Sequence, residues 1–129
     1  MLARSRLAHL PYARRMNSYH MWFDLRDSHK DLEFSQALAD YLNYLKNKSL
    51  IAGWTLQRRK FGFGPDSLGE FHCVVQVTDL TQFDAAFGHV ATRTGEVERL
   101  HRPVYSAVSN FKSALYRDFP DPQRLATNA

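Results

Sequence analysis

The chain has 129 residues, of which 44% are hydrophobic and 23% charged, a composition typical of one globular domain with a real core. Its net charge of +4 comes from residues 1–15, which hold four arginines and no acid, so that 13 of the 17 basic residues are left to face 13 acidic ones. This balance argues against a nucleic-acid partner. No apolar run approaches the roughly 20 residues of a membrane span. The single cysteine, Cys73, excludes an intramolecular disulfide and fits a cytoplasmic location.

The sequence divides into three parts. Residues 1–16 form a basic tail that we expect to be disordered, either an over-extended translation start or a targeting segment. Residues 17–122 form the folded domain. Residues 123–129 are predicted to be a frayed C-terminus, because Pro120 and Pro122 cannot extend a strand.

The first predicted strand, residues 18–26, has apolar residues at odd positions and mixed residues at even ones. Side chains alternate between the two faces of a strand, so the odd positions predict a core face. A helix is predicted after Asp27 and Ser28, which are both good N-caps. Its apolar stripe consists of Leu32, Phe34, Leu38, Tyr41, Leu42 and Leu45.

The second predicted strand, residues 52–61, turns Ala52, Trp54 and Leu56 towards the helices. Residues 61–69 contain three glycines and a proline and are interpreted as a structural connection, with a flap over a site as the alternative. The third strand, residues 70–77, again has apolar odd positions, which include Cys73. Asp79 is predicted to cap the next helix.

This second helical pattern is interrupted at Gly95 and resumes at Glu96, until Pro103 bends or ends it. His101 lies on its apolar stripe and is interpreted as a satisfied core histidine rather than a haem ligand. A last strand is predicted at residues 109–117, with Phe111, Ser113 and Leu115 inward. The order of elements predicts an α+β, ferredoxin-like βαββαβ fold with a four-stranded antiparallel sheet and both helices on one face.

This order, the chain length and the ending Ala114-Leu-Tyr-Arg-Asp-Phe-Pro-Asp121 resemble a small family of uncharacterised bacterial proteins. That family is similar to the stress-responsive dimeric α/β-barrel proteins of the ferredoxin-like superfamily. The resemblance covers residues 17–122 and implies a homodimer in which two sheets face each other and enclose a cavity. It implies no catalytic motif, because the superfamily includes cofactor-free monooxygenases, haem-dependent enzymes, small isomerases and proteins with no known chemistry.

The face of the sheet without helices holds the candidate site. A tryptophan exposed among polar residues is typical of an interface, so this face predicts a homodimer through Trp22. One register places His72 opposite Asp24, whose carboxylate would orient the imidazole as a general base. The alternatives are a pair that only fixes the dimer, or a register in which the two never meet. The candidate ligand contacts are His20, Trp22, Arg59, Gln76 and Tyr116.

A metal site would use His20, His72 and Asp24. The two histidines lie near the starts of antiparallel strands and thus towards opposite ends of the sheet, so neither a metal nor a cofactor is predicted. Two classes of function remain. The first is a small-molecule site in the dimer cavity, with cofactor-free proton transfer or oxygenation on a small apolar or aromatic substrate. The second is a non-catalytic structural or stress-response dimer.

Overall fold

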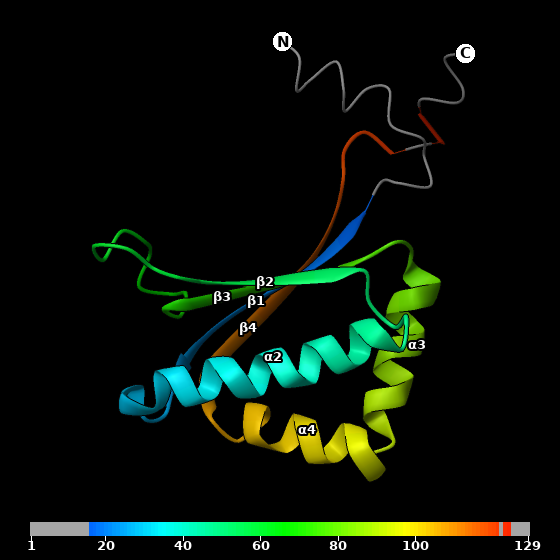
Figure 1. Ribbon diagram of the computed structural model, residues 1–129. Coiled ribbons are helices and arrows are strands. Elements are labelled where there is room, and N and C mark those ends of the chain that lie inside the picture. Colours follow the sequence, from blue (N-terminus) through cyan, green and yellow to red (C-terminus); the bar gives the residue numbers. More distant parts are fainter. Residues whose placement is uncertain (1–15, 122, 125–129) are drawn as a thin grey trace.

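The computed structural model describes residues 16–121 and 123–124, and its four-stranded antiparallel sheet carries its helices on one face (Figure 1). The sheet order is β2-β3-β1-β4. These elements confirm the α+β, ferredoxin-like prediction. The predictions for residues 1–15 and for the last five residues lie outside the described residues. The strands are β1 (Asn17–Leu25), β2 (Gly53–Arg58), β3 (Phe71–Val77) and β4 (Val108–Arg117), and the helices are η2 (Ser28–Lys30, a 3-10 turn), α2 (Asp31–Asn47), α3 (Leu80–Ala91) and α4 (Gly95–Tyr105).

The core lies between the sheet and the helices. The odd positions of β1 and β3 face it, as their alternation predicts: Phe23, Cys73 and Val77 are 3%, 1% and 0% exposed. Trp54 and Leu56 of β2 pack against the same core. Burying one such phenylalanine or valine stabilises the fold by about 1.5–3 kcal/mol, so this face holds the sheet and helices together.

The first long helix, α2, buries the stripe that its periodicity predicts, with one exception. Asp27 caps the turn before it by accepting a hydrogen bond from the backbone N of His29. Leu32 was predicted to belong to the stripe, but it is 81% exposed. It precedes Phe34 by two residues, which turns it to the opposite side of the helix. The buried stripe is Phe34, Leu38, Tyr41, Leu42 and Leu45.

Two helices follow β3, and the break between them lies at residues 92–94, directly before the predicted interruption at Gly95. Gly95 has φ +65°, a left-handed conformation that glycine adopts without strain. Asp79 caps α3 by accepting from the backbone N of Gln82 at 2.8 Å. Pro103 lies inside α4 near its C-terminal end and does not end it. None of the helices in the described residues is long and apolar enough to cross a membrane.

The edge strand β4 contains a bulge. Its pairing with β1 shifts between Trp22 and Asp24, so that Asn110 and Phe111 stand opposite the single residue Phe23. Asn110 has φ +52°, a conformation tolerated better by asparagine than by most other residues. Phe111 faces the helix side but stays 50% exposed at the sheet edge.

Candidate functional site

The helix-free face is the side of the sheet opposite the helices. Its centre is a group of stacked rings: Trp22 and His72 lie with ring centroids 4.9 Å apart and planes 4° apart. The Nδ1 of His20 is 3.0 Å from the Nε2 of His72, a hydrogen bond between two imidazoles. The ring of Tyr116 meets that of His20 edge-on at 4.9 Å. We define this face by Ser18, His20, Trp22, His72, Val74, Gln76, Lys112, Ala114 and Tyr116.

The predicted register of the two central strands is wrong by two residues. His72 pairs with Trp22 rather than with Asp24, and His20 pairs with Val74 rather than with Gln76. The histidines are therefore in contact, not at opposite ends of the sheet. The reason lies just before β3, where the backbone at Gly69 passes so close to Phe23 that an added Cβ would stand 2.3 Å from its carbonyl carbon.

Asp24 is used for structure. Its Oδ1 accepts a hydrogen bond from the backbone N of Glu70 at 2.8 Å, and its Oδ2 accepts from the Nδ2 of Asn110 at 3.1 Å. It therefore joins β1 to the chain before β3 and to the bulge of β4. The pairing of Asp24 with His72, on which the general-base hypothesis depended, is not present.

Two further candidates are separated from this ring group. Arg59 follows β2, and its Nη2 donates to the carbonyls of Pro65, Leu68 and Gly69 at 3.0, 2.8 and 3.4 Å. Gln76 is exposed and pairs with Ser18, which lies two residues before His20 on β1. The structure thus brings together His20, Trp22, His72 and Tyr116. The Arg59 side chain is instead hydrogen bonded to the loop that follows it.

The surroundings of His72 disfavour its charged form. Partial burial, and then the charge of His20, lower the pKa of His72 below its ordinary 6.5. The hydrogen bond between the rings needs one donor and one acceptor, and this holds for two neutral rings or for a pair with one added proton. Within the described residues, no group of three or more His, Cys, Asp or Glu side chains could hold a metal ion.

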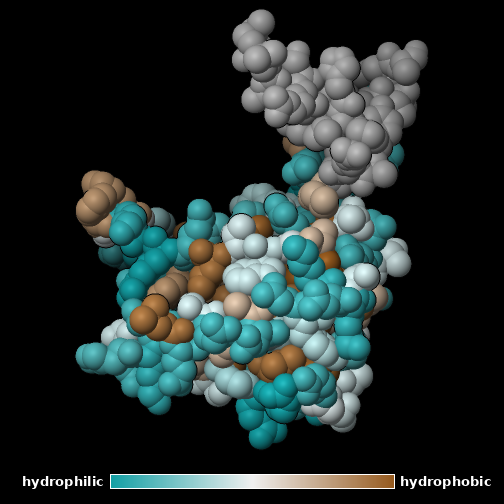
Figure 2. Space-filling view, viewed as in Figure 1, coloured by the Kyte–Doolittle hydropathy of each residue, from teal (hydrophilic) through white to brown (hydrophobic). Residues whose placement is uncertain are grey.

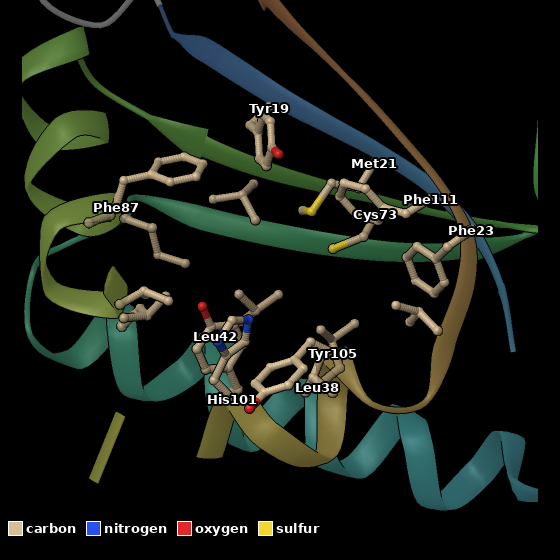
Figure 3. Close-up of a pocket in the computed structure, with 18 of the residues that line it drawn as sticks. Tyr19, Met21, Phe23, Leu38, Leu42, Cys73, Phe87, His101, Tyr105 and Phe111 are labelled. Carbon is tan, nitrogen blue, oxygen red and sulfur yellow. The ribbon is translucent and has the colours of Figure 1, made fainter. Parts of the chain in front are cut away.

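A cavity of about 330 Å³ lies on the other side of the sheet, between the strands and the helices (Figure 3). Met21, Phe23 and Cys73 line it from the strands, and Leu38 and Leu42 line it from α2. The sequence analysis assigned these side chains to the core and did not predict a cavity among them. Alternation and periodicity show which side chains turn inward, but they do not show how completely those side chains fill the space.

Aromatic residues stand where this cavity reaches the surface. Phe87 of α3 and Phe111 of β4 line it and are 49% and 50% exposed. Tyr19 contacts both Phe83 and Phe87 edge-on, with ring centroids 5.3 and 5.6 Å apart. The opening is therefore itself apolar.

His101 of α4 is the exceptional polar group in the cavity wall. Its Nδ1 is buried and has no hydrogen-bond partner among the described residues. Its ring stacks on Tyr41 at 4.7 Å and meets Tyr105 edge-on at 4.8 Å. The interpretation of His101 as a satisfied core histidine is therefore wrong. A usable signal was present, because His101 and Tyr41 are polar-tipped rings on the apolar stripes of two different helices.

Burial decides which groups of the cavity can exchange a proton. It lowers the pKa of His101, an effect opposed by Glu98 and reinforced by Arg93. It raises the pKa of Tyr41, and that of Cys73 to about 12. At neutral pH the phenol and the thiol stay protonated and the imidazole is neutral. His101 is thus the cavity group suited to acid–base chemistry near neutrality.

Tyr105 is held in place beside His101 from outside the cavity. Its hydroxyl donates to the Oε2 of Glu98 at 2.7 Å. Glu98 is 9% exposed and also contacts Arg93 at 3.4 Å and Arg102 at 3.3 Å. The hydrogen bond from Tyr105, followed by the arginines, lowers the pKa of Glu98, so this carboxylate remains charged.

Comparison with solved structures shows the fold. SnoaB, a cofactor-independent oxygenase from Streptomyces nogalater, is 12% identical with a TM-score of 0.61, covering 82% of this chain and 95% of its own. A dimeric ferredoxin-like protein of unknown function from Thermobifida fusca is 10% identical with a TM-score of 0.60, covering 85% and 97%. A DABB family protein from Mesorhizobium loti is 16% identical with a TM-score of 0.60, covering 82% and 99%.

At these identities the similarity shows the architecture alone. Among curated proteins, none matches this sequence. A family model matches residues 16–129, a range that includes every strand and helix of the described domain. The chain therefore belongs to DUF6614, a family of unknown function.

Proposed function

We propose that this protein binds a small, largely apolar molecule in the cavity between the sheet and the helices, where His101 meets the molecule's one polar group. The observation that carries the proposal is the buried Nδ1 of His101, which has no partner among the described residues. Leaving a buried polar atom unpaired costs about 1–3 kcal/mol, and a ligand that pairs with it recovers part of that cost.

The size and the lining support the same ligand class. A cavity of about 330 Å³ lies at the lower end of the range of small-molecule sites, which is roughly 300–1,000 Å³. Tyr41 and Tyr105 flank His101 with ring faces and edges, and Phe87 and Phe111 stand at the opening. Such walls favour a flat aromatic molecule with a single hydroxyl or carbonyl group.

Proton transfer is the chemistry this arrangement supports. Because its pKa is lowered, neutral His101 can take a proton from an acidic O–H or activated C–H of the ligand, forming imidazolium and the ligand anion. Oxygenation is the finer form of the proposal: dioxygen would then react with that anion. It is favoured by the similarity in fold to SnoaB, which is described as a cofactor-independent oxygenase.

Fluorescence titration with 2-naphthol tests the binding site. We expect wild-type protein to bind the probe and His101→Phe to bind it at least about tenfold more weakly, because phenylalanine keeps the ring but loses the hydrogen bond. His29→Phe is the matched control, since the His29 side chain is 96% exposed and is not part of the cavity lining. Equal affinity of wild type and His101→Phe would contradict the assigned role.

We also propose that the chain forms a homodimer through the helix-free face. The stacked rings of Trp22 and His72, with Tyr116 beside them, would be partly covered by the partner sheet. Some structures of similar fold are described as dimeric, which supports the proposal. A non-catalytic dimer is the competing function. It is favoured if no aromatic probe enters the cavity while the dimer persists.

We also propose a second candidate site, in which His72 acts as a catalytic base without Asp24. This site would lie in a space between the two facing sheets of the proposed dimer. In that case His20, Trp22, Gln76 and Tyr116 would contact its ligand. The observation that favours it is the hydrogen bond of 3.0 Å between the two imidazoles, because one ring fixes the tautomer of the other. His72→Phe should then abolish turnover while 2-naphthol still binds near His101.

A further inference from the structure

The segment between β2 and β3 carries a pair of exposed phenylalanines at its tip. Phe61 and Phe63 are 87% and 83% exposed, and their rings contact each other at 6.3 Å in a T-shaped arrangement. Figure 2 shows a hydrophobic cluster at the end of a projection from the body of the protein, where Figure 1 places this segment. We call residues 59–70 the aromatic arm. Paired exposed rings on a projection mark an interaction surface.

The arm is built to hold its tip in one place. Arg59 spans it by donating to three of its carbonyls, those of Pro65, Leu68 and Gly69. Gly64 makes room for that side chain, since a Cβ there would stand 2.4 Å from the Nε of Arg59. Lys112 of β4 ties the arm to the sheet by donating to the carbonyl of Ser67. The two rings are thus presented by a braced loop.

The arm projects on the side of the dimer interface proposed above. In Figure 1 it rises from the sheet away from α2 and α4. The segment after β4 rises on the same side at the opposite end of the sheet, and its Phe119 is 80% exposed. The helix-free face therefore lies between two raised ends that both carry exposed aromatic side chains.

We propose that Phe61 and Phe63 clasp a second copy of this chain, docked on the helix-free face. The inference rests on the proposed dimer and adds the residues that secure it. A two-fold axis between two such faces places each arm over one end of the partner sheet. It then meets either the partner's arm or the segment after the partner's β4, and both are aromatic. Four phenylalanines, two from each copy, would add about 600 Å² or more to an interface that usually needs 1,200–2,000 Å².

The charge of the arm favours a protein partner over a lipid surface. Arg59 and Lys60 are offset by Asp66 and Glu70. Arg59 is also turned inward onto the arm's own carbonyls. Binding to anionic lipid instead requires an excess of basic residues around the apolar tip.

Sedimentation velocity over a dilution series tests this inference with the full chain. We expect the double variant Phe61→Ser/Phe63→Ser to raise the dimer dissociation constant about 100-fold or more, because buried aromatic anchors dominate interfaces. Leu32→Ser is the matched control, since Leu32 is 81% exposed but lies at the start of α2, and its dissociation constant should equal that of wild type. Circular dichroism confirms that each variant is folded.

The outcomes separate the inference from the proposal beneath it. A wild-type dimer that the double variant leaves unchanged would overturn the arm's role and keep the dimer. A monomeric wild type would overturn both, while the 2-naphthol titration would still report on the cavity. Pelleting of wild type with phosphatidylcholine–phosphatidylglycerol vesicles that is lost in the double variant, without a change in dimerisation, would assign the arm to membranes and overturn the inference.

Discussion

The two faces of one sheet are built from alternate residues of the same strands, yet one is covered by helices and the other is not. On the helix side, Phe23, Cys73 and Val77 are almost fully buried, but the space above them is not completely filled. On the helix-free side, Trp22 and His72 remain partly exposed although their rings are stacked. The covered face with room left in it supports the proposed ligand site, whereas the ordered aromatic face without a cover supports the proposed homodimer.

The largest expected effect comes from a charge on the helix-free face. Trp22→Glu should convert the proposed dimer to monomer or aggregate, because docking would bury an unpaired carboxylate against the partner sheet. Leu32→Glu places the same charge on the helix side and should leave the dimer intact. Analytical ultracentrifugation at micromolar concentration measures both. A Trp22→Glu protein that dimerises like wild type would remove this face from the interface.

The second largest effect is expected at Asp24, which joins β1 to the chain before β3 and to the bulge of β4. Asp24→Ala leaves the backbone N of Glu70 and the Nδ2 of Asn110 without their acceptor, and it should cost about 2–4 kcal/mol of unfolding free energy. The control Asp84→Ala removes an exposed carboxylate of α3 and should change stability by less than about 0.5 kcal/mol. Urea denaturation of both variants measures the difference. A loss at Asp24 no larger than at Asp84 would contradict its structural role.

Low pH should destabilise the fold through one histidine on each face of the sheet. His72 and His101 have pKa values lowered from 6.5, so the unfolded chain binds protons more readily than the folded one as the pH falls through this value. The stability present above pH 6.5 is then lost below it. We expect calorimetry to show a lower melting temperature at pH 5.5 than at pH 7.5, by about 2–5 °C. His101→Phe should remove part of this dependence, whereas an undiminished dependence would show that His101 does not contribute.

The smallest effect separates the observed neighbours of His72 from the predicted one. His20→Asn should raise the pKa of His72, because the charge of His20 is one cause of its lowering. Asp24→Asn should leave that pKa almost unchanged, since the carboxylate is hydrogen bonded elsewhere. NMR titration of the His72 ring in the two variants measures this. A clear shift only in Asp24→Asn would revive the paired-base hypothesis.

The fold followed from local patterns that need no tertiary information. Alternation in β1 and β3, the stripe of α2 and the cap at Asp79 each depend on residues close together in the chain. The assignment of Leu32 to the buried stripe of α2 was wrong because its angular position on the helix was not taken into account.

The candidate site depended on details that alternation does not carry. A shift of two residues keeps every side chain on the same face, so no hydrophobic pattern could distinguish His72 opposite Asp24 from His72 opposite Trp22. The close approach of Gly69 to Phe23 decides between them, and it joins segments distant in sequence. The cavity was missed for a related reason. Whether Tyr41, His101 and Cys73 leave a space depends on the distance between layers, which composition does not specify.

The contacts of Asp24 also bear on how long the folded state persists. They join residues 46 and 86 positions apart in the chain, so they can form only after two long loops have closed. We therefore expect these contacts to form after the rate-limiting step of folding, in which case their loss mainly accelerates unfolding. In stopped-flow kinetics, Asp24→Ala should therefore raise the unfolding rate, while the refolding rate stays close to that of wild type. A single carboxylate that joins β1 to β4 and to the chain before β3 would thus set the lifetime of the domain rather than the speed of its assembly.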